Sequence, residues 1–170
     1  MDSQTKNEMV TPEQLIEQLH LEPHPEGGYF KETYRSKEKM VCANNNQRNL
    51  STTIFYLLED TQKSHFHRLS SDEQWFFHMG QTLEIVLIEG GKARSILLGT
   101  NFQNGETLQA LIPANTWFSA KINESTGYAL ASCTVSPGFD FHDFELGNRE
   151  LLIQEFPQLK ERIIEFTRQK

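Results

Sequence analysis

Residues 65–80, HFHRLSSDEQWFFHMG, contain the pattern on which the interpretation of this chain depends. His65 and His67 stand two residues apart on an extended segment, so their imidazoles are expected to point the same way. Glu73 enters from the next segment and can converge on them. Two imidazoles and one carboxylate can hold a divalent metal with open positions, or can act as acid, base and orienting group without one. The segment therefore predicts a pocket that binds a metal ion or carries out acid–base chemistry.

The strand that contains Glu73 predicts what lines this pocket. Alternation along a strand places Glu73, Trp75 and Phe77 on one face. If that face points inward, the pocket is an apolar, aromatic cavity with a few polar groups, which is the usual form of a small-molecule site. His78 has the opposite parity and would need a β-bulge to reach the pocket.

Short extended segments follow one another around this stretch. They are rich in β-branched and aromatic residues, and turn signals such as Asn104-Gly105 separate most of them. The expected strands are 29–35, 52–58, 65–69, 73–79, 82–88, 93–98, 107–112, 116–120 and 128–135, and the polar run 44–47 is expected to be a loop. The pattern predicts an all-β core of sandwich or barrel type.

Short helices are expected at both ends of the chain. Thr11 can cap a helix that has Pro12 at its first position, and Gln14 completes a capping box, so this helix should run to about Leu19. Near the C-terminus, apolar residues recur at steps of four and three, which marks one face of a helix. Pro157 should end one helix there and start the next.

Composition limits the class of protein. The length fits one domain, 11–170, after a polar tail, 1–10, that is expected to be disordered and lacks the apolar core of a secretory signal. No apolar stretch is long enough to cross a bilayer, so no membrane partner is expected. Because the tail lacks a secretory signal, the cytoplasm is the expected location. A net charge of −7 without a cluster of Lys and Arg argues against nucleic acid as a partner. Cys42 and Cys133 are expected to be reduced thiols.

Residues 65–80 also resemble the first motif of the cupin superfamily. His65, His67, Glu73 and Gly80 follow its order, with one extra residue in the turn. The resemblance implies a double-stranded β-helix, or jelly-roll barrel, with a ligand pocket inside. It also implies that the chain assembles as a homodimer.

The second cupin motif is matched less completely. Gly105, Pro113, Asn115 and Phe118 resemble it in order and spacing, with Asn115 where cupins place glycine. Cupins that bind metal carry a histidine, the fourth protein ligand, at the position of Phe118. Phenylalanine cannot coordinate a metal, so the resemblance leaves the presence of a metal open.

Five blocks, two of them within the motifs above, resemble a short, single-domain branch of the cupins that is known as a domain of unknown function. These blocks are residues 24–30 with 32–35, 51–54 with 56–58, 67–69 with 71–73 and 75, 113 with 117, and 135–139 with 141, 143 and 144. Together they cover roughly residues 11 to 155, nearly the whole expected fold. The resemblance supplies no reaction for this branch.

The candidate site residues have different expected roles. His67 is the expected general base, and Glu73 is expected to orient or protonate the substrate. The ligand-binding candidates are His65, Tyr29, Arg35, Trp75, Phe77, His78, Trp117 and Phe118. The glycine pair in residues 26–29 is typical of a turn before a strand, and the resemblance implies that this turn lies at the edge of the pocket. His24 has no evident partner.

Three functions remain open at this stage. The first is a metal-independent isomerase or epimerase acting on a small polar metabolite, such as a sugar or sugar nucleotide, by analogy with similar metal-free cupins. The second is a non-catalytic module that binds or senses a small ligand. The third is a metal-dependent oxygenase or isomerase in which His65, His67 and Glu73 hold iron, manganese, nickel or zinc. The metal-free functions are preferred because one expected ligand is missing.

Overall fold

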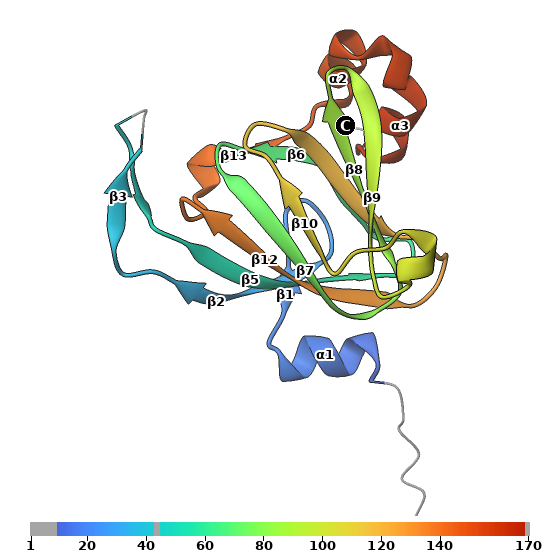
Figure 1. Cartoon of the computed structure of the whole chain (residues 1–170), viewed down its shortest axis with the longest axis horizontal. Helices are drawn as coiled ribbons and strands as arrows, with labels where there is room; N and C mark the ends of the chain where they lie inside the picture. The colour runs from blue at the N-terminus through green and yellow to red at the C-terminus, as the bar shows by residue number, and fades with distance from the viewer. Residues whose placement is uncertain (1–9, 43–44, 169–170) are drawn as a thin grey trace, which may run out of the picture.

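The structure is a computed structural model that describes residues 10–42 and 45–168 (Figure 1). Nearly all of the predicted tail, 1–10, lies outside the described residues. None of the helices in the described ranges has the length and apolar character that crossing a bilayer requires.

Two antiparallel sheets form the body of the protein (Figure 1). The first has the order β1 (Glu22–Pro23), β2 (Tyr29–Arg35), β5 (Thr52–Glu59), β12 (Tyr128–Ser136), β7 (Asp72–Gly80) and β10 (Gln109–Ile112). The second has the order β13 (Phe144–Leu146), β6 (Lys63–Leu69), β11 (Trp117–Ile122), β8 (Leu83–Glu89) and β9 (Lys92–Leu98). The predicted all-β jelly roll is confirmed, and each of the nine predicted strands is present.

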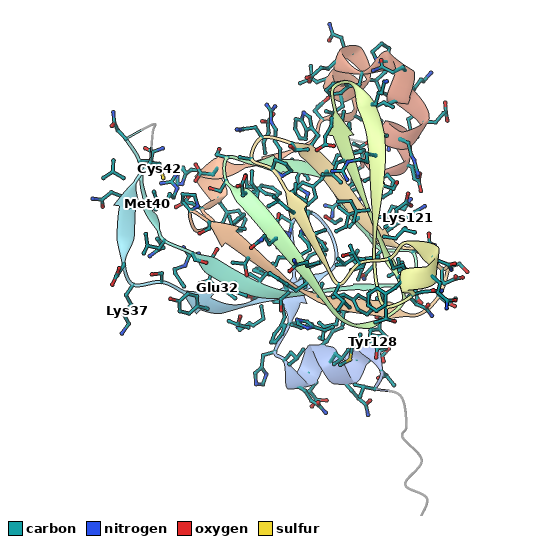
Figure 2. All side chains as sticks on the ribbon, viewed as in Figure 1. Glu32, Lys37, Met40, Cys42, Lys121 and Tyr128 are labelled. Carbon is teal, nitrogen blue, oxygen red and sulfur yellow. The ribbon has the colours of Figure 1, made fainter. Side chains whose placement is uncertain are left out.

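A separate hairpin stands away from both sheets. It consists of β3 (Lys39–Val41) and β4 (Gln47–Asn49), and Met40 and Cys42 mark it in Figure 2. Part of the predicted loop 44–47 is therefore strand, because Gln47 begins β4. Four short strands, β1, β3, β4 and β13, were not predicted, because segments of two or three residues are too short to show an alternation.

The core between the sheets comes from the inward face of each strand, as the period of two predicts. The strand β8 is buried on both faces: Ile85 and Leu87 enter the core between the sheets, whereas Val86 and Ile88 face the C-terminal helices. Full burial of each such side chain stabilises the fold by about 1.5–3 kcal/mol.

The C-terminal helices cover the outer face of the second sheet. They are α2 (Arg149–Glu155) and α3 (Lys160–Glu165), separated by a 3-10 turn that begins at Pro157, as predicted. Leu152, Ile163 and Phe166 bury their side chains against the sheet. Lys121, labelled in Figure 2, lies 2.7 Å from a carboxylate oxygen of Glu165.

The N-terminal helix α1 (Pro12–Gln18) packs on the outside of the first sheet. Its predicted capping box is present: the Gln14 amide donates to the Thr11 hydroxyl and the Thr11 amide donates to the Gln14 side chain. Leu15 is buried with Leu57 and Leu130. The two cysteines are free thiols, as predicted.

Candidate functional site

A cavity of about 390 Å³ lies between the two sheets at one end of the barrel. Its walls come from β2, β5, β6, β7 and β12 and from the chain that leads into β13. Its buried end carries two imidazoles, His24 and His67, and two carboxyl groups, Glu26 and Glu73, whereas most of the remaining wall is apolar or aromatic. The cavity therefore combines an apolar body with a small polar end.

The imidazole of His67 is held in one tautomer. The residue is 2% exposed, its ring centroid lies 4.1 Å from that of Phe118, and its Nδ1 lies 2.8 Å from the backbone carbonyl of His65. A carbonyl oxygen only accepts, so Nδ1 carries a proton and donates it. In the neutral ring, Nε2 is then an acceptor that faces the cavity.

Glu26 is the partner of this acceptor. Its Oε2 lies 3.1 Å from Nε2 of His67, and Ser64 donates to its other oxygen at 3.0 Å. Two acceptors cannot form a hydrogen bond, so one proton must lie between carboxyl and imidazole. Burial raises the pKa of Glu26 and lowers the pKa of His67 to about 4, so both shifts favour a neutral pair with the shared proton on Glu26.

A tight turn places Glu26 in the cavity. Gly27 has φ +116°, and a Cβ at this position would lie 2.0 Å from the backbone oxygen of Lys63. The Tyr56 hydroxyl donates to the Gly27 carbonyl at 2.6 Å, and the His65 amide donates to the Glu26 carbonyl at 2.9 Å. Glycine is needed here both for the backbone conformation and for the close approach to β6.

Glu73 faces the other side of the polar end. It is 6% exposed, and its Oε2 has no hydrogen-bond partner within the described ranges. Burial, with a smaller effect of the nearby Glu26, raises the pKa of Glu73 to about 8. The nearby Cys133 thiol and Trp75 indole oppose the rise, although the indole N–H does not have hydrogen-bonding geometry to the carboxyl group. Glu73 is therefore a carboxylic acid at neutral pH and can donate a proton.

The Trp75 indole is a second buried polar group at this end of the cavity. Its Nε1 is buried and, like the Glu73 oxygen, lacks a partner among the described residues. A buried polar group without a partner costs about 1–3 kcal/mol. Both side chains line the cavity from neighbouring inward positions of β7, so a ligand can satisfy both.

His65 lies outside the cavity, which corrects the expectation that the two imidazoles share a face. In the pairing of β6 with β11, Phe118 is opposite His67 but Ala120 is opposite Ser64, so β6 contains one extra residue. This bulge breaks the alternation. The Nδ1 of His65 instead lies 2.6 Å from the Glu26 carbonyl, and the ring borders grooves on the outer surface.

Two more ligand-binding candidates lie on outer faces of the sheets. Tyr29 packs in the cluster beneath α1. Trp117 lies beneath the C-terminal helices, with the Arg68 guanidinium 4.5 Å from its ring centroid. The expectation that they line the pocket is wrong, because the outer faces of these sheets are also covered and an apolar side chain can be buried on either side.

Three further candidates do not line the cavity. His78 is the extra residue of a bulge in β7, and its Nε2 bonds to Ser132 on the outer face. Phe77 faces inward but belongs to the core beyond the cavity. Phe118 supports the ring of His67 from behind.

Four candidates do come together in the cavity: His67, Glu73, Trp75 and Arg35. Arg35 lies at the exposed end, where it donates to Glu32. His24 was missed as a site residue, and Glu26 was expected only at the edge of the pocket, without a role in its chemistry. The available signal was that Glu26 directly precedes the glycine pair in a block shared with the cupin branch.

The residues present do not fit the metal centre that the cupin resemblance implies. Phe118 occupies the position of the fourth ligand, His65 is turned away, and both nitrogens of His67 face protein oxygens. Within residues 10–42 and 45–168, no group of three or more His, Cys, Asp or Glu side chains has an arrangement that could hold a metal ion. The predicted set of His65, His67 and Glu73 is not assembled.

Comparisons of the sequence agree with this fold. The model of one family, described as Cupin superfamily (DUF985), matches residues 13–147. An uncharacterised protein of Saccharomyces cerevisiae is 34% identical over 155 residues, which cover 82% of this chain and 77% of the yeast protein.

Solved structures show the same similarity. A protein of Shewanella oneidensis has a TM-score of 0.88 at 37% identity, covering 95% of this chain and all of its own. A hypothetical protein of Leishmania major has a TM-score of 0.88 at 34% identity, covering 94% of this chain and all of its own. Oxalate decarboxylase of Bacillus subtilis, at 14% identity and a TM-score of 0.54 over 85% of this chain and 36% of its own, shares the fold alone.

Proposed function

The chain belongs to the cupin superfamily, in the family described as DUF985, and we propose that its barrel binds a small molecule and catalyses proton transfer on it without a metal. The observation that carries this proposal is the contact of 3.1 Å between Glu26 and His67, in which one proton lies between two buried groups. A second, separately held carboxylic acid, Glu73, lines the same cavity.

The pair can act as a base without an external proton acceptor. When the shared proton moves to Nε2 of His67, Glu26 becomes a carboxylate and can accept a proton from a carbon next to a substrate carbonyl. Glu73 donates its own proton to the carbonyl oxygen, so the substrate becomes an enol and the total charge is unchanged. Return of a proton to a different face or carbon completes an isomerisation. In this scheme the base is the Glu26–His67 pair rather than His67 alone.

Exchange of substrate protons with solvent deuterium tests this proposal. Small carbonyl compounds are incubated with the protein in deuterated buffer, and loss of the proton next to the carbonyl is followed by NMR. Glu26→Gln, His67→Gln and Glu73→Gln are each expected to slow the exchange by about 100-fold or more. Glu124→Gln, in an exposed turn, is the matched control. Exchange retained within a few-fold in Glu26→Gln would remove the pair from the mechanism.

A non-catalytic ligand-binding module is the second candidate. It is supported by the mostly apolar wall and by the two polar atoms that lack partners within the described part of the chain, because both features favour binding but require no turnover. Saturable binding of a compound whose protons do not exchange would favour this function.

The homodimer and the cytoplasmic location remain proposals that rest on the sequence. The expectation of a sugar or sugar nucleotide as ligand is likewise a proposal, and the charge of the cavity bears on it as described next. Sedimentation velocity measures the oligomeric state directly.

A further inference from the structure

We propose that the ligand is an uncharged carbonyl compound with an apolar, ring-containing body, bound with its carbonyl oxygen between Glu73 and Trp75. This inference names the substrate class of the site proposed above and rests on that proposal for its location in the cavity. It argues against phosphorylated sugars and sugar nucleotides.

The two polar atoms without a partner among residues 10–42 and 45–168, Nε1 of Trp75 and Oε2 of Glu73, define the group that binds at the buried end. The Trp75 indole N–H can only donate, and a protonated Glu73 donates through its O–H. Both atoms are buried, belong to alternate residues of one strand and line the same cavity. An oxygen with two lone pairs, such as that of a carbonyl, accepts from both.

The charge of the cavity excludes an anionic head group at this end. Arg35 is the only lysine or arginine among the lining residues that the structure describes. Its guanidinium is already engaged, by Glu32 at 2.6 and 2.9 Å and by two further oxygens, of Asn49 at 3.0 Å and Phe139 at 3.1 Å. Burial lowers the pKa of both His24 and His67, so neither imidazole is a cation in the resting site. A carboxylate or phosphate beside Glu26 and Glu73 would therefore lack a counterion among the described lining residues, which is strongly unfavourable.

The remaining wall determines the body of the ligand. The Phe139 ring packs edge-to-face against Phe141 at 5.0 Å and against Phe144 at 6.2 Å, and Phe30 and Trp75 extend this aromatic surface. Phe141 is 58% exposed, so its ring is available to a ligand. The hydroxyl groups of a sugar would find few partners on such a wall, whereas a ring would bury apolar surface at about 25 cal/mol per Å².

Matched pairs of neutral and anionic probes test the inference. Acetophenone is compared with benzoate, and cinnamamide with cinnamate, together with glucose and UDP-glucose. Dissociation constants are measured by ligand-observed NMR on the full chain at about pH 6.5, where Glu73 is protonated. The neutral member of each pair is expected to bind at least 10-fold more tightly than its anion.

Two substitutions at one position separate the donor from the shape. Glu73→Gln retains an N–H donor and should keep the affinity for acetophenone within about 3-fold, whereas Glu73→Leu removes the donor and should weaken it by about 10-fold. Equal or tighter binding of the anions, binding of the sugars alone, or no binding by any neutral probe would overturn the inference. Binding of acetophenone without exchange of its methyl protons would support the substrate class while refuting the proposed proton transfer.

Discussion

Replacement of Glu73 by glutamine should make the protein more stable at neutral and alkaline pH. Glu73 is 6% exposed, and burial raises its pKa from 4.5 to about 8. The native state therefore keeps a proton that the unfolded chain releases. The sign follows from linkage. The contribution of Glu73 to the free energy of unfolding is fully present below pH 4.5 and is lost as the pH rises towards 8, because only the unfolded state gains a charge at Glu73 in this range. Glutamine has the same shape and does not ionise.

The size of the effect follows from the same interval. Each pH unit between the two pKa values changes the free energy of unfolding by about 1.4 kcal/mol, so the wild type should lose about 4 kcal/mol of stability between about pH 5 and pH 8. This is a large part of the 5–15 kcal/mol by which a typical domain is stable. The variant should therefore match the wild type near pH 5 within about 1 kcal/mol and exceed it by about 4 kcal/mol at pH 8.

Urea unfolding followed by tryptophan fluorescence measures this difference. Trp75 and Trp117 are both buried and will report loss of the fold. Because the variant is compared with the wild type at each pH, the titration of other groups cancels to first order. Glu124→Gln, at an exposed position, should show no such trend. If the difference in free energy of unfolding between Glu73→Gln and the wild type changed by less than about 1 kcal/mol from about pH 5 to pH 8, the conclusion that Glu73 is a buried neutral acid would be refuted.

Three other perturbations have definite expected results. Burial lowers the pKa of His67 from 6.5 to about 4, so the native state binds fewer protons at this residue than the unfolded chain does. The free energy of unfolding should therefore fall as the pH drops from 6.5 to about 4. His67→Gln should remove that part of the acid sensitivity in the same urea assay. Gly27→Ala should lower the free energy of unfolding by more than about 2 kcal/mol, because the added Cβ would meet the Lys63 carbonyl oxygen. Gly105→Ala, at φ +77° with no atom within 4 Å of the added Cβ, should lower it by only about 1 kcal/mol, for the strained backbone alone. Similar losses in the two variants would contradict the importance of this contact. Phe166→Ala should cost about 3–5 kcal/mol by chemical denaturation, and a loss below about 1 kcal/mol would show that the C-terminal helices contribute little to the fold.

The local patterns that sequence can express were reproduced well. The nine long strands, the capping box at Thr11 and the helix break at Pro157 all depend on near neighbours in the chain. Asn115, which replaces the usual cupin glycine, has φ +62°, a left-handed conformation that asparagine tolerates better than most residues. These features were predictable because propensity, period and turn chemistry act over a few residues.

The composition of the site was only partly predictable. Glu73, Trp75 and His67 reach the cavity from two strands whose facing was inferred correctly. The inference for His65 was wrong because β6 contains one extra residue between Ser64 and His67. This bulge interrupts the alternation, so His65 and His67 point to opposite faces of the sheet. A register shift of this kind depends on pairing with β11, fifty residues further along the chain, and leaves no mark in the local sequence.

Sequence alone determined that this chain is an all-β barrel with a mostly apolar cavity and a histidine and a glutamate at its polar end. Only the tertiary structure decided that the partner of His67 is Glu26. The turn at Gly27 brings that carboxyl to β6 from about forty residues away, and burial of both groups then determines where their shared proton resides. Period and propensity are properties of neighbouring residues, whereas protonation in a buried site depends on which distant groups are brought within a few ångströms of each other.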